Sequence, residues 1–233
     1  NAIISLADEG GLLAQANDAD KALSKGEYWG WMHGMPHAVK DLADVRGFLS
    51  TSGSPLLAKN IATKDSLAIE RIRHAGAIFI GKTNTPEFGL GSQTYNTVFG
   101  TTRNAYNPSL CAGGSSGGAA VGLAAQLLPV ADGSDMMGSL RNPAAFNNVI
   151  GFRPTKGRVP GADENSKLFF DQLATDGPMG RDVTDTIKLL TTMAGFDARE
   201  PLSLQETLPR AESFVPTTLE DGVTLTISPN IWF

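Results

Sequence analysis

Gly113-Gly114-Ser115-Ser116-Gly117-Gly118 is the stretch of this 233-residue sequence that says most about the fold. Two glycine pairs surround two serines, so the hydroxyls stand on backbone that can adopt conformations closed to other residues. A helix is predicted directly afterwards, over residues 119–127, and its free N–H groups point into the same space. A flexible loop and an anion-binding loop are alternative interpretations. The mononucleotide and dinucleotide patterns both fail, because no Gly-Lys-Ser/Thr follows and no glycine fingerprint directly follows a strand.

A second stretch, Gly133-Ser134-Asp135-Met136-Met137-Gly138-Ser139-Leu140-Arg141-Asn142-Pro143, follows a predicted buried strand over residues 128–131. The strand leads into a tight turn that carries Ser139, and a short helix follows. This arrangement exposes a nucleophile beside free backbone N–H groups, donors that can each lower the barrier to a tetrahedral oxyanion by roughly 3–4 kcal/mol. Ser139 as an ordinary helix N-cap is the alternative interpretation, because serine is a favoured cap.

The third stretch is the turn and short apolar strand that ends in Ala38-Val39-Lys40-Asp41. A lysine at such a position is usually a snorkelling or salt-bridged group, and Asp41 beside it is more often a structural partner than a catalyst. The strand resembles the Val-Ala-Ile-Lys of protein kinases only superficially, because the sequence has no His-Arg-Asp or Asp-Phe-Gly segment. Lys40 alone therefore carries no functional assignment.

A histidine base, a thiol nucleophile and a metal site are the other chemistries to weigh. His74 is predicted near the end of a helix, where a cation is favourable, whereas His33 and His37 flank a turn and could reach a site. No Gly-x-Ser-x-Gly elbow is present, so the usual Ser-His-Asp arrangement is not indicated. Cys111 lacks a context typical of a catalytic thiol. With three histidines and no paired ligand spacing, we expect no metal.

Composition limits the class of protein. The chain has 18% charged and 41% hydrophobic residues, as in a globular protein with a sizeable core. Its net charge is −5 without a basic stripe, so we expect no nucleic-acid partner, and without a long apolar run we expect no membrane span. The single cysteine excludes an internal disulfide and fits a cytoplasmic location. Because the sequence starts at Asn1 rather than methionine, a removed targeting segment stays open.

Glycines at segment ends and the spacing of apolar residues predict the remaining elements. A helix is expected over residues 3–23, closed by Gly26, and the region 141–152 holds a short helix and a strand. The other predicted elements are a helix capped by Asp65 and ended by Gly76, a strand over 77–81, a helix over 182–194 with Asp182 as cap and Gly195 as stop, a polar surface segment over 197–222, and a last strand over 223–227. Helices that alternate with short apolar strands indicate one α/β domain over residues 1–233.

Together these stretches resemble the amidase signature family. Its Gly-x-Pro-x-x-Val-Lys-Asp, Gly-Gly-Ser-Ser-Gly-Gly and Gly-Ser-Asp-x-x-Gly-Ser-x-Arg-x-Pro-Ala-Ala-Phe motifs all occur here in the family's order. Ser115 and Ser139 stand 24 positions apart, which is the family's spacing. Intervening segments agree as well, namely Gly81-Lys82-Thr83-Asn84, Phe99-Gly100-Thr101-Thr102-Arg103-Asn104 and Gly151-Phe152-Arg153-Pro154-Thr155. The resemblance extends from about Asn1 to Gly195.

The resemblance implies an α/β amidase signature fold, a mixed twisted β-sheet flanked by helices on both sides. It also implies a Ser–cis-Ser–Lys triad, in which Ser139 is the nucleophile, Ser115 the bridging serine of a cis peptide and Lys40 the base. The implied oxyanion hole consists of the backbone N–H groups of Met136, Met137, Gly138 and Ser139. Supporting positions are Gly113, Gly114, Ser116 and Asp135. Neither a cofactor nor a metal is implied.

The implied reaction is hydrolysis of a carboxamide C–N bond, in a linear or cyclic amide, through an acyl-enzyme. Most members carry glycine where Met137 stands, and a Met-Met pair resembles the branch of cyclic amide-oligomer hydrolases, a hint of bulky or apolar amides. Members are about twice as long, so the chain corresponds to the N-terminal signature core of a longer protein. Alternatives are an amidotransferase A-type subunit that releases ammonia from glutamine, and a truncated, inactive member that acts as a binding protein. A small-molecule amide is the expected partner, and a homodimer is compatible with the resemblance.

Overall fold

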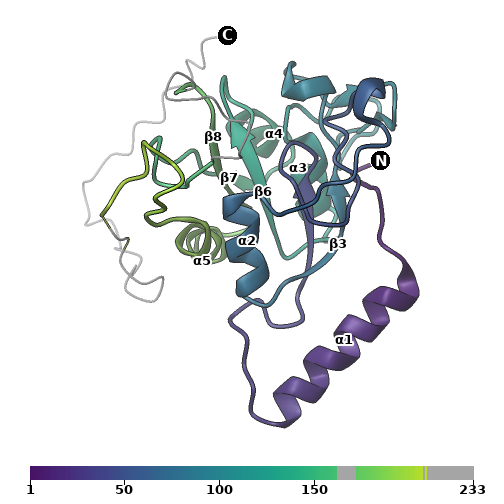
Figure 1. The fold of residues 1–233 in the computed structure, drawn as a ribbon. Coiled ribbons are helices and arrows are strands. Elements are labelled where there is room, and N and C mark those ends of the chain that lie inside the picture. The colour runs from purple at the N-terminus through teal and green to yellow at the C-terminus, as the bar shows by residue number, and fades with distance from the viewer. Residues whose placement is uncertain (162–171, 207, 209–233) are drawn as a thin grey trace, which may run out of the picture.

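A computed structural model describes residues 1–161, 172–206 and 208 of the chain (Figure 1). Its elements are, in order, β1 (Ile3–Ile4), α1 (Glu9–Ser24), β2 (Pro36–Lys40), η1 (Pro55–Leu57), α2 (Leu67–His74), β3 (Ile78–Thr83), η2 (Glu87–Gly89), β4 (Tyr95–Asn96), β5 (Gly100–Thr101), α3 (Gly117–Ala124), β6 (Val130–Asp135), α4 (Arg141–Phe146), β7 (Ile150–Gly151), β8 (Thr175–Gly180) and α5 (Val183–Met193). The strand predicted over residues 223–227, and the predicted surface segment beyond residue 208, lie outside the described residues. No helix of the described part is long and apolar enough to cross a membrane.

The described strands are divided over three hydrogen-bonded sheets. The first is mixed, because β2 runs parallel to β3 and β1 antiparallel to it. The second is antiparallel, with β8 between β6 and β7, and β4 and β5 form a small antiparallel pair. The predicted α/β class is thus confirmed, and β2 and β6 lie at the seam between the two larger sheets.

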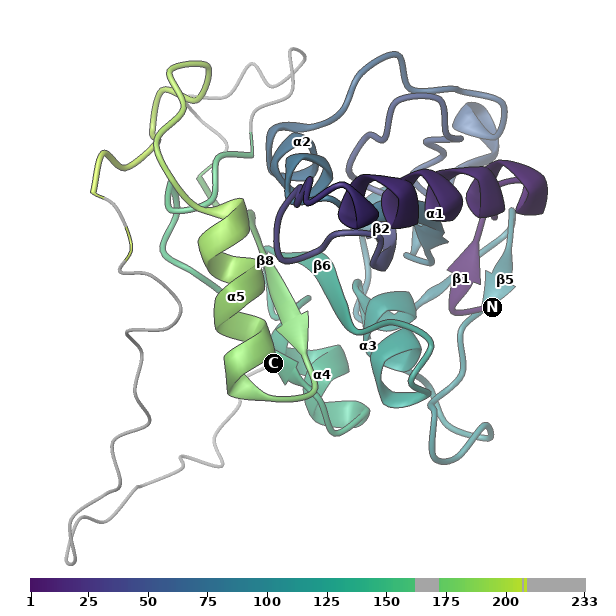
Figure 2. The same cartoon turned by 90° about the horizontal axis from the view of Figure 1, so that it is seen from below.

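Helices cover both faces of these sheets, as the resemblance implies. Val39 of β2 and Val130 of β6 belong to one buried cluster, whereas their neighbours Ala38 and Ala131 belong to another. This alternation is expected because successive strand residues point to opposite faces. The first cluster packs against α2 and α5, and the second against α3 and α4, so α2 and α3 lie on opposite sides of β6 (Figures 1 and 2).

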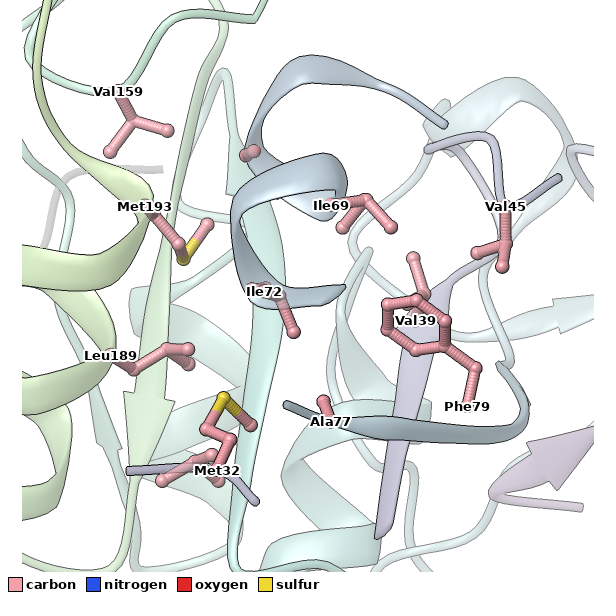
Figure 3. Close-up of a cluster of buried hydrophobic side chains, with 12 residues drawn as sticks. Met32, Val39, Val45, Ile69, Ile72, Ala77, Phe79, Val159, Leu189 and Met193 are labelled. Carbon is pink, nitrogen blue, oxygen red and sulfur yellow. The ribbon is translucent and has the colours of Figure 1, made fainter. Parts of the chain in front are cut away.

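The first cluster joins α2 to α5. Figure 3 shows Leu189 and Met193 of α5 pointing toward Ile72 of α2, and all three side chains are at most 1% exposed. Burying an aliphatic side chain of this size stabilises a fold by about 1.5–3 kcal/mol. These helices therefore cover one face of β2 and β6, the strands that carry polar residues described below.

Two predicted helix starts are wrong. The first helix starts at Glu9 rather than residue 3, because Asp8 caps it by accepting a hydrogen bond from Gly11 N, while Ile3 and Ile4 pair with β3. The N-cap of α2 is Ser66 rather than Asp65. The Asp65 carboxylate instead accepts hydrogen bonds from Arg46 N at 2.7 Å and from the Arg73 guanidinium at 2.6 Å, and the second bond joins two charged groups and is stronger than a bond to a neutral N–H.

The other helices lie close to their predicted positions. The Asp182 carboxylate accepts a hydrogen bond from Asp185 N at 2.8 Å and caps α5, and Gly195 follows with φ 121°, a conformation that favours glycine. The helix predicted over residues 119–127 starts two residues earlier, at Gly117, so the glycine stretch enters the helix directly. The predicted strand over 128–131 lies at 130–135.

Candidate active site

Lys40, the last residue of β2, ends in a pocket of serine hydroxyls. Its side chain is buried, and its Nζ lies within hydrogen-bonding distance of Ser115 Oγ at 2.7 Å, Ser116 Oγ at 2.8 Å and Ser134 Oγ at 3.0 Å. The first two serines come from the loop before α3, and the third comes from β6. Lys40, Ser115 and Ser134 each come from a different one of the three stretches singled out in the sequence, so all three stretches meet at one amine.

The surroundings of Lys40 alter its protonation. Burial lowers the pKa of the Lys40 amine from 10.5 to about 7, against the opposing charges of Asp176, Asp132 and Asp135. An ammonium group loses its hydration in such a site, so the neutral amine is favoured relative to water. Around neutral pH a large fraction of Lys40 is therefore uncharged and able to accept a proton.

The glycines of the Gly113–Gly118 stretch are required by close approaches. A Cβ on Gly113, whose φ is 74°, would lie 2.9 Å from Pro143 Cα, and one on Gly114 would lie 3.0 Å from the Gln93 backbone. Real Cβ atoms do not approach backbone so closely. The peptide bond between Gly114 and Ser115 is cis, as the resemblance implies. The stretch is thus a packed loop, and the flexible-loop interpretation is not supported.

Ser139 lies next to this loop. Ser116 N donates a hydrogen bond to Ser139 O at 3.2 Å, so the two serine-bearing turns are joined through their backbones. The N-cap of α4 is Leu140, which leaves Ser139 one residue outside the helix and removes the interpretation of Ser139 as its cap. The Ser139 side chain is half-buried, and among the described residues its hydroxyl forms no hydrogen bond with Ser115.

Three of the four predicted oxyanion donors have free N–H groups. Within the described part of the chain, the backbone N–H groups of Met136, Met137 and Ser139 donate to no protein acceptor. The Gly138 N–H is different, because it donates to Asp135 Oδ1 at 2.8 Å. The expectation for Gly138 is therefore corrected: its amide shapes the turn and is not free to bind an oxyanion.

Asp135 organises the turn in which these donors lie. Its buried carboxylate accepts hydrogen bonds from Gly138 N and Leu140 N, and forms ion pairs with Arg141 at 3.0 Å and Arg153 at 2.7 Å. Burial alone would raise the pKa of Asp135, but the hydrogen bonds from Arg141, Gly138 and Arg153 outweigh it and hold the pKa well below its usual range. Asp135 thus remains a carboxylate and keeps the turn around Ser139 in place.

The histidines hold structural positions. His37 is a buried residue of β2, with Nε2 3.0 Å from Asp132 Oδ1, and His33 Nε2 lies 2.8 Å from Ala19 O. His74 is the last residue of α2, as predicted. No hydrogen bond in the described part of the chain joins a histidine to Ser115 or Ser139, so the histidine-base alternative has no geometric support. Cys111 is exposed and free.

Two carboxylates near Lys40 were not predicted from the sequence. Asp132 accepts a hydrogen bond from Lys40 N at 3.1 Å, and Asp176 of β8 is the cross-strand neighbour of Ser134. Burial, and after it the nearby charge of Asp132, raises the pKa of Asp176 from 3.8 to about 6, against the attraction of Lys40. An aspartate inside an apolar strand, such as Asp132, is a signal that could have indicated a paired buried charge.

Comparison with known proteins shows the family of the chain. The family model described as Amidase matches residues 1–225. The chain belongs to the amidase family. It is 44% identical over 193 residues to the A-type subunit of the glutamyl-tRNA(Gln) amidotransferase of Burkholderia thailandensis, covering 83% of this chain and 38% of that protein. The chain spans well under half the length of the curated relatives it matches.

Solved amidase structures share the fold. A bacterial aryl acylamidase of the amidase signature enzymes superposes with a TM-score of 0.82 and 34% sequence identity, covering 88% of this chain and 43% of that chain. A 6-aminohexanoate cyclic dimer hydrolase complexed with substrate gives a TM-score of 0.80 and 31% identity, covering 92% of this chain and 43% of that chain. The chain therefore has the amidase signature fold over the part of these structures that it covers.

Proposed function

We propose that the protein hydrolyses a carboxamide, with Ser139 as nucleophile, Ser115 as bridging serine and Lys40 as base. The observation that carries this proposal is the buried amine of Lys40 at 2.7 Å from Ser115 Oγ, with a pKa lowered to about 7. A base with a pKa near the working pH is the kind that proton transfer in catalysis requires.

In the proposed reaction, Ser139 Oγ attacks the carbonyl carbon and gives its proton to Ser115 Oγ, which gives its own to Lys40 Nζ. The C–N bond then breaks, and the proton returns along the same route to the leaving amine. Water hydrolyses the acyl-enzyme with the same base. The N–H groups of Met136, Met137 and Ser139 are the proposed donors to the oxyanion. Ser139 must rotate toward Ser115 for the first transfer, since substrate-free sites often have longer contacts than working ones.

Apolar side chains are exposed next to the proposed nucleophile. Met136 is 39% exposed and Met137 82% exposed, directly before the Gly138–Ser139 turn. Arg153 donates hydrogen bonds to Met136 O and to Leu173 O, and thereby brings the exposed Leu173 beside them. Side chains of this kind favour an amide with an apolar acyl or amine group over a charged one. The relative named as a hydrolase of 6-aminohexanoate cyclic dimer accords with such a substrate.

Labelling with an alkyl fluorophosphonate tests the proposal. The intact protein should form one adduct on Ser139, located by peptide mass spectrometry, and Ser139→Ala should form none under the same conditions. Ser109→Ala, a change in an exposed loop serine, is the matched control and should label like the wild type. A folded wild-type protein that forms no adduct on Ser139 would favour the inactive binding protein instead.

An amidotransferase A-type subunit is the second candidate, because the curated relative from Burkholderia thailandensis carries that name. Such a subunit would use the same three residues to release ammonia from glutamine for a partner subunit. Release of ammonia from glutamine, together with a purified assembly larger than this protein alone, would favour it. Turnover of simple apolar amides by the isolated protein would favour the amidohydrolase.

The remaining proposals concern the whole protein. We take residues 1–233 as a single amidase domain that forms the N-terminal signature core of a longer chain, and a small-molecule amide as its partner. A homodimer and a cytoplasmic location stay predictions. Light scattering of the purified intact protein tests the first, and localisation of the tagged protein in the cell tests the second.

A further inference from the structure

A carboxylate side chain joins the two larger sheets at the point where Lys40 lies. In the part of the chain that the structure describes, β2 and β6 are neighbours but share no backbone ladder, since they belong to different sheets. The side chain of Asp132 of β6 joins these two strands instead. Its Oδ2 accepts the backbone N–H of Lys40 at 3.1 Å, and its Oδ1 lies 3.0 Å from His37 Nε2, so the carboxylate contacts β2 at two points.

This link is buried and orientated. His37 is 0% and Asp132 3% exposed, and the ring of His37 also packs edge-on against Phe79 at 6.0 Å between centroids. Among the described residues His37 Nδ1 has no hydrogen-bond partner. The tautomer with its proton on Nε2 donates to the carboxylate and leaves no unsatisfied donor at Nδ1. His37 therefore holds the Asp132 carboxylate, and this carboxylate accepts the backbone N–H of Lys40.

The position of the link relates it to the reacting groups. Pairing between β2 and β3 shifts register between His37 and Ala38, so β3 does not hold this part of β2 in a regular ladder. The two contacts of Asp132 lie on either side of that irregularity. They fix the last residue of β2, whose side chain meets the serine hydroxyls only a few ångströms away.

We propose that Asp132, held by His37, is a positioning residue that fixes the end of β2 on β6 and aims Lys40 Nζ at Ser115. The proposal rests on the proposed function, in which Lys40 accepts the proton. It assigns a catalytic consequence to a strand contact that would otherwise only stabilise the fold.

Other charges also act on Lys40 and must be separated from Asp132. Asp135 lies on the same strand as Asp132, and Asp176 lies on β8, and both charges raise the pKa of Lys40. The Lys82–Asp41 ion pair, 3.4 Å long, lies on the side of β3. The negative charge of Asp132 raises the pKa of Lys40 against burial. Removing that charge should therefore lower the pH at which Lys40 loses its proton.

Two variants test the link. Asp132→Asn removes the charge, and its single amide oxygen can accept from Lys40 N or from His37 Nε2 but not from both, so one of the two contacts with β2 is lost. The double variant His37→Gln with Asp132→Asn replaces this buried pair by two neutral amides. It is the second test if Asp132→Asn alone folds poorly. Asp18→Asn, on the exposed face of α1, is the control for loss of a distant carboxylate.

The titration of Lys40 is read by ¹³C NMR of the lysine side chains in the intact protein, with the Lys40 signal identified by its loss in Lys40→Met. Fluorophosphonate labelling is measured at a pH well above the titration midpoint of Lys40, where the amine is neutral in every variant. We expect the Lys40 midpoint to fall by about one pH unit in either Asp132 variant, and labelling to fall about tenfold through misalignment. Asp18→Asn should change neither.

The outcomes separate the two levels of the proposal. A folded Asp132→Asn protein with the wild-type midpoint and the wild-type labelling rate overturns the positioning role, even though the proposed function stands. A shifted midpoint with unchanged labelling also overturns it, since the charge would then act without aiming the amine. A wild type that is never labelled contradicts the proposed function and, with it, the positioning role, and a midpoint that still shifts then shows only that Asp132 acts on Lys40 through its charge.

Discussion

Lys40 Nζ and Ser115 Oγ lie 2.7 Å apart, and both side chains are almost completely excluded from solvent. A charged lysine is rare in such a place, because burial of an ammonium group is costly without a carboxylate in direct contact. Three serine hydroxyls surround the amine instead. Hydroxyls can donate to a neutral amine or accept from a charged one, so the site tolerates both protonation states and suits a group that exchanges a proton.

Lys40→Met tests whether the amine itself is needed. Methionine has a similar length and removes the proton acceptor, so fluorophosphonate labelling of Ser139 should fall by about 10²–10⁴-fold. The unfolding free energy should change little, because the loss of three hydrogen bonds is offset by the removal of a buried amine. Chemical denaturation checks the second expectation. Near wild-type labelling in a folded Lys40→Met protein would remove Lys40 from the mechanism.

The pH dependence of labelling follows from the lowered pKa of Lys40. The base must be uncharged, and its pKa is lowered by burial from 10.5 to about 7. Labelling should therefore rise by about tenfold per pH unit below pH 7 and level off above it. A profile that keeps rising toward pH 10 would indicate an ordinary exposed amine. Rates measured at constant ionic strength, with the folded state checked by circular dichroism, make this comparison.

The candidate site could be proposed from the sequence because its residues stand in three short motifs that together resemble the amidase signature family, whereas no single stretch was sufficient. The role of Asp132 could not be proposed, because an aspartate in an apolar strand indicates a buried partner but does not say which residues of another strand it contacts. The strand β8 was missed for a related reason. Its sequence, Thr175-Asp176-Gly177-Pro178-Met179-Gly180, has the residues of a turn, yet it pairs with strands on both sides.

Tertiary packing explains why β8 contains those residues. A Cβ on Gly177 would lie 2.5 Å from Phe152 O, so only glycine permits the neighbouring chain to approach. Pro178 has no N–H to donate, but its carbonyl accepts a hydrogen bond from Phe152 N at 3.1 Å. The correct prediction of α5 is the opposite case, since its cap, its apolar spacing and its terminal glycine are all local signals.

Asp182→Ala tests that local account of α5. The Asp182 carboxylate accepts from Asp185 N at 2.8 Å, and loss of such a cap costs about 1 kcal/mol of stability. Because Asp182 follows Gly180, the end of β8 that pairs with Val130 and lies away from Ser134, labelling per folded molecule should be unchanged. Urea denaturation measures the first effect. Asp182→Asn should retain most of the stability, since asparagine caps nearly as well, and equal losses in both variants would contradict the capping role.

Asp176→Asn should change how the free energy of unfolding depends on pH. Burial, followed by the charge of Asp132, raises the pKa of Asp176 from 3.8 to about 6 in the folded protein. Between these values the folded state binds more protons than the unfolded state, so the contribution of Asp176 to stability is present below pH 4 and is lost as the pH rises through 6. Asparagine does not titrate. The variant should therefore gain about 1–3 kcal/mol relative to the wild type between pH 4 and pH 7.

Urea denaturation of both proteins at pH 4, 5, 6 and 7 measures this difference. Asp18→Asn, which removes an exposed carboxylate from α1, should follow the wild type at every pH. A difference between Asp176→Asn and the wild type that stays constant from pH 4 to pH 7 would mean that Asp176 titrates as it does in water. Lys40 would then be facing a full negative charge in that range, and its amine would stay protonated to a higher pH than the labelling profile requires.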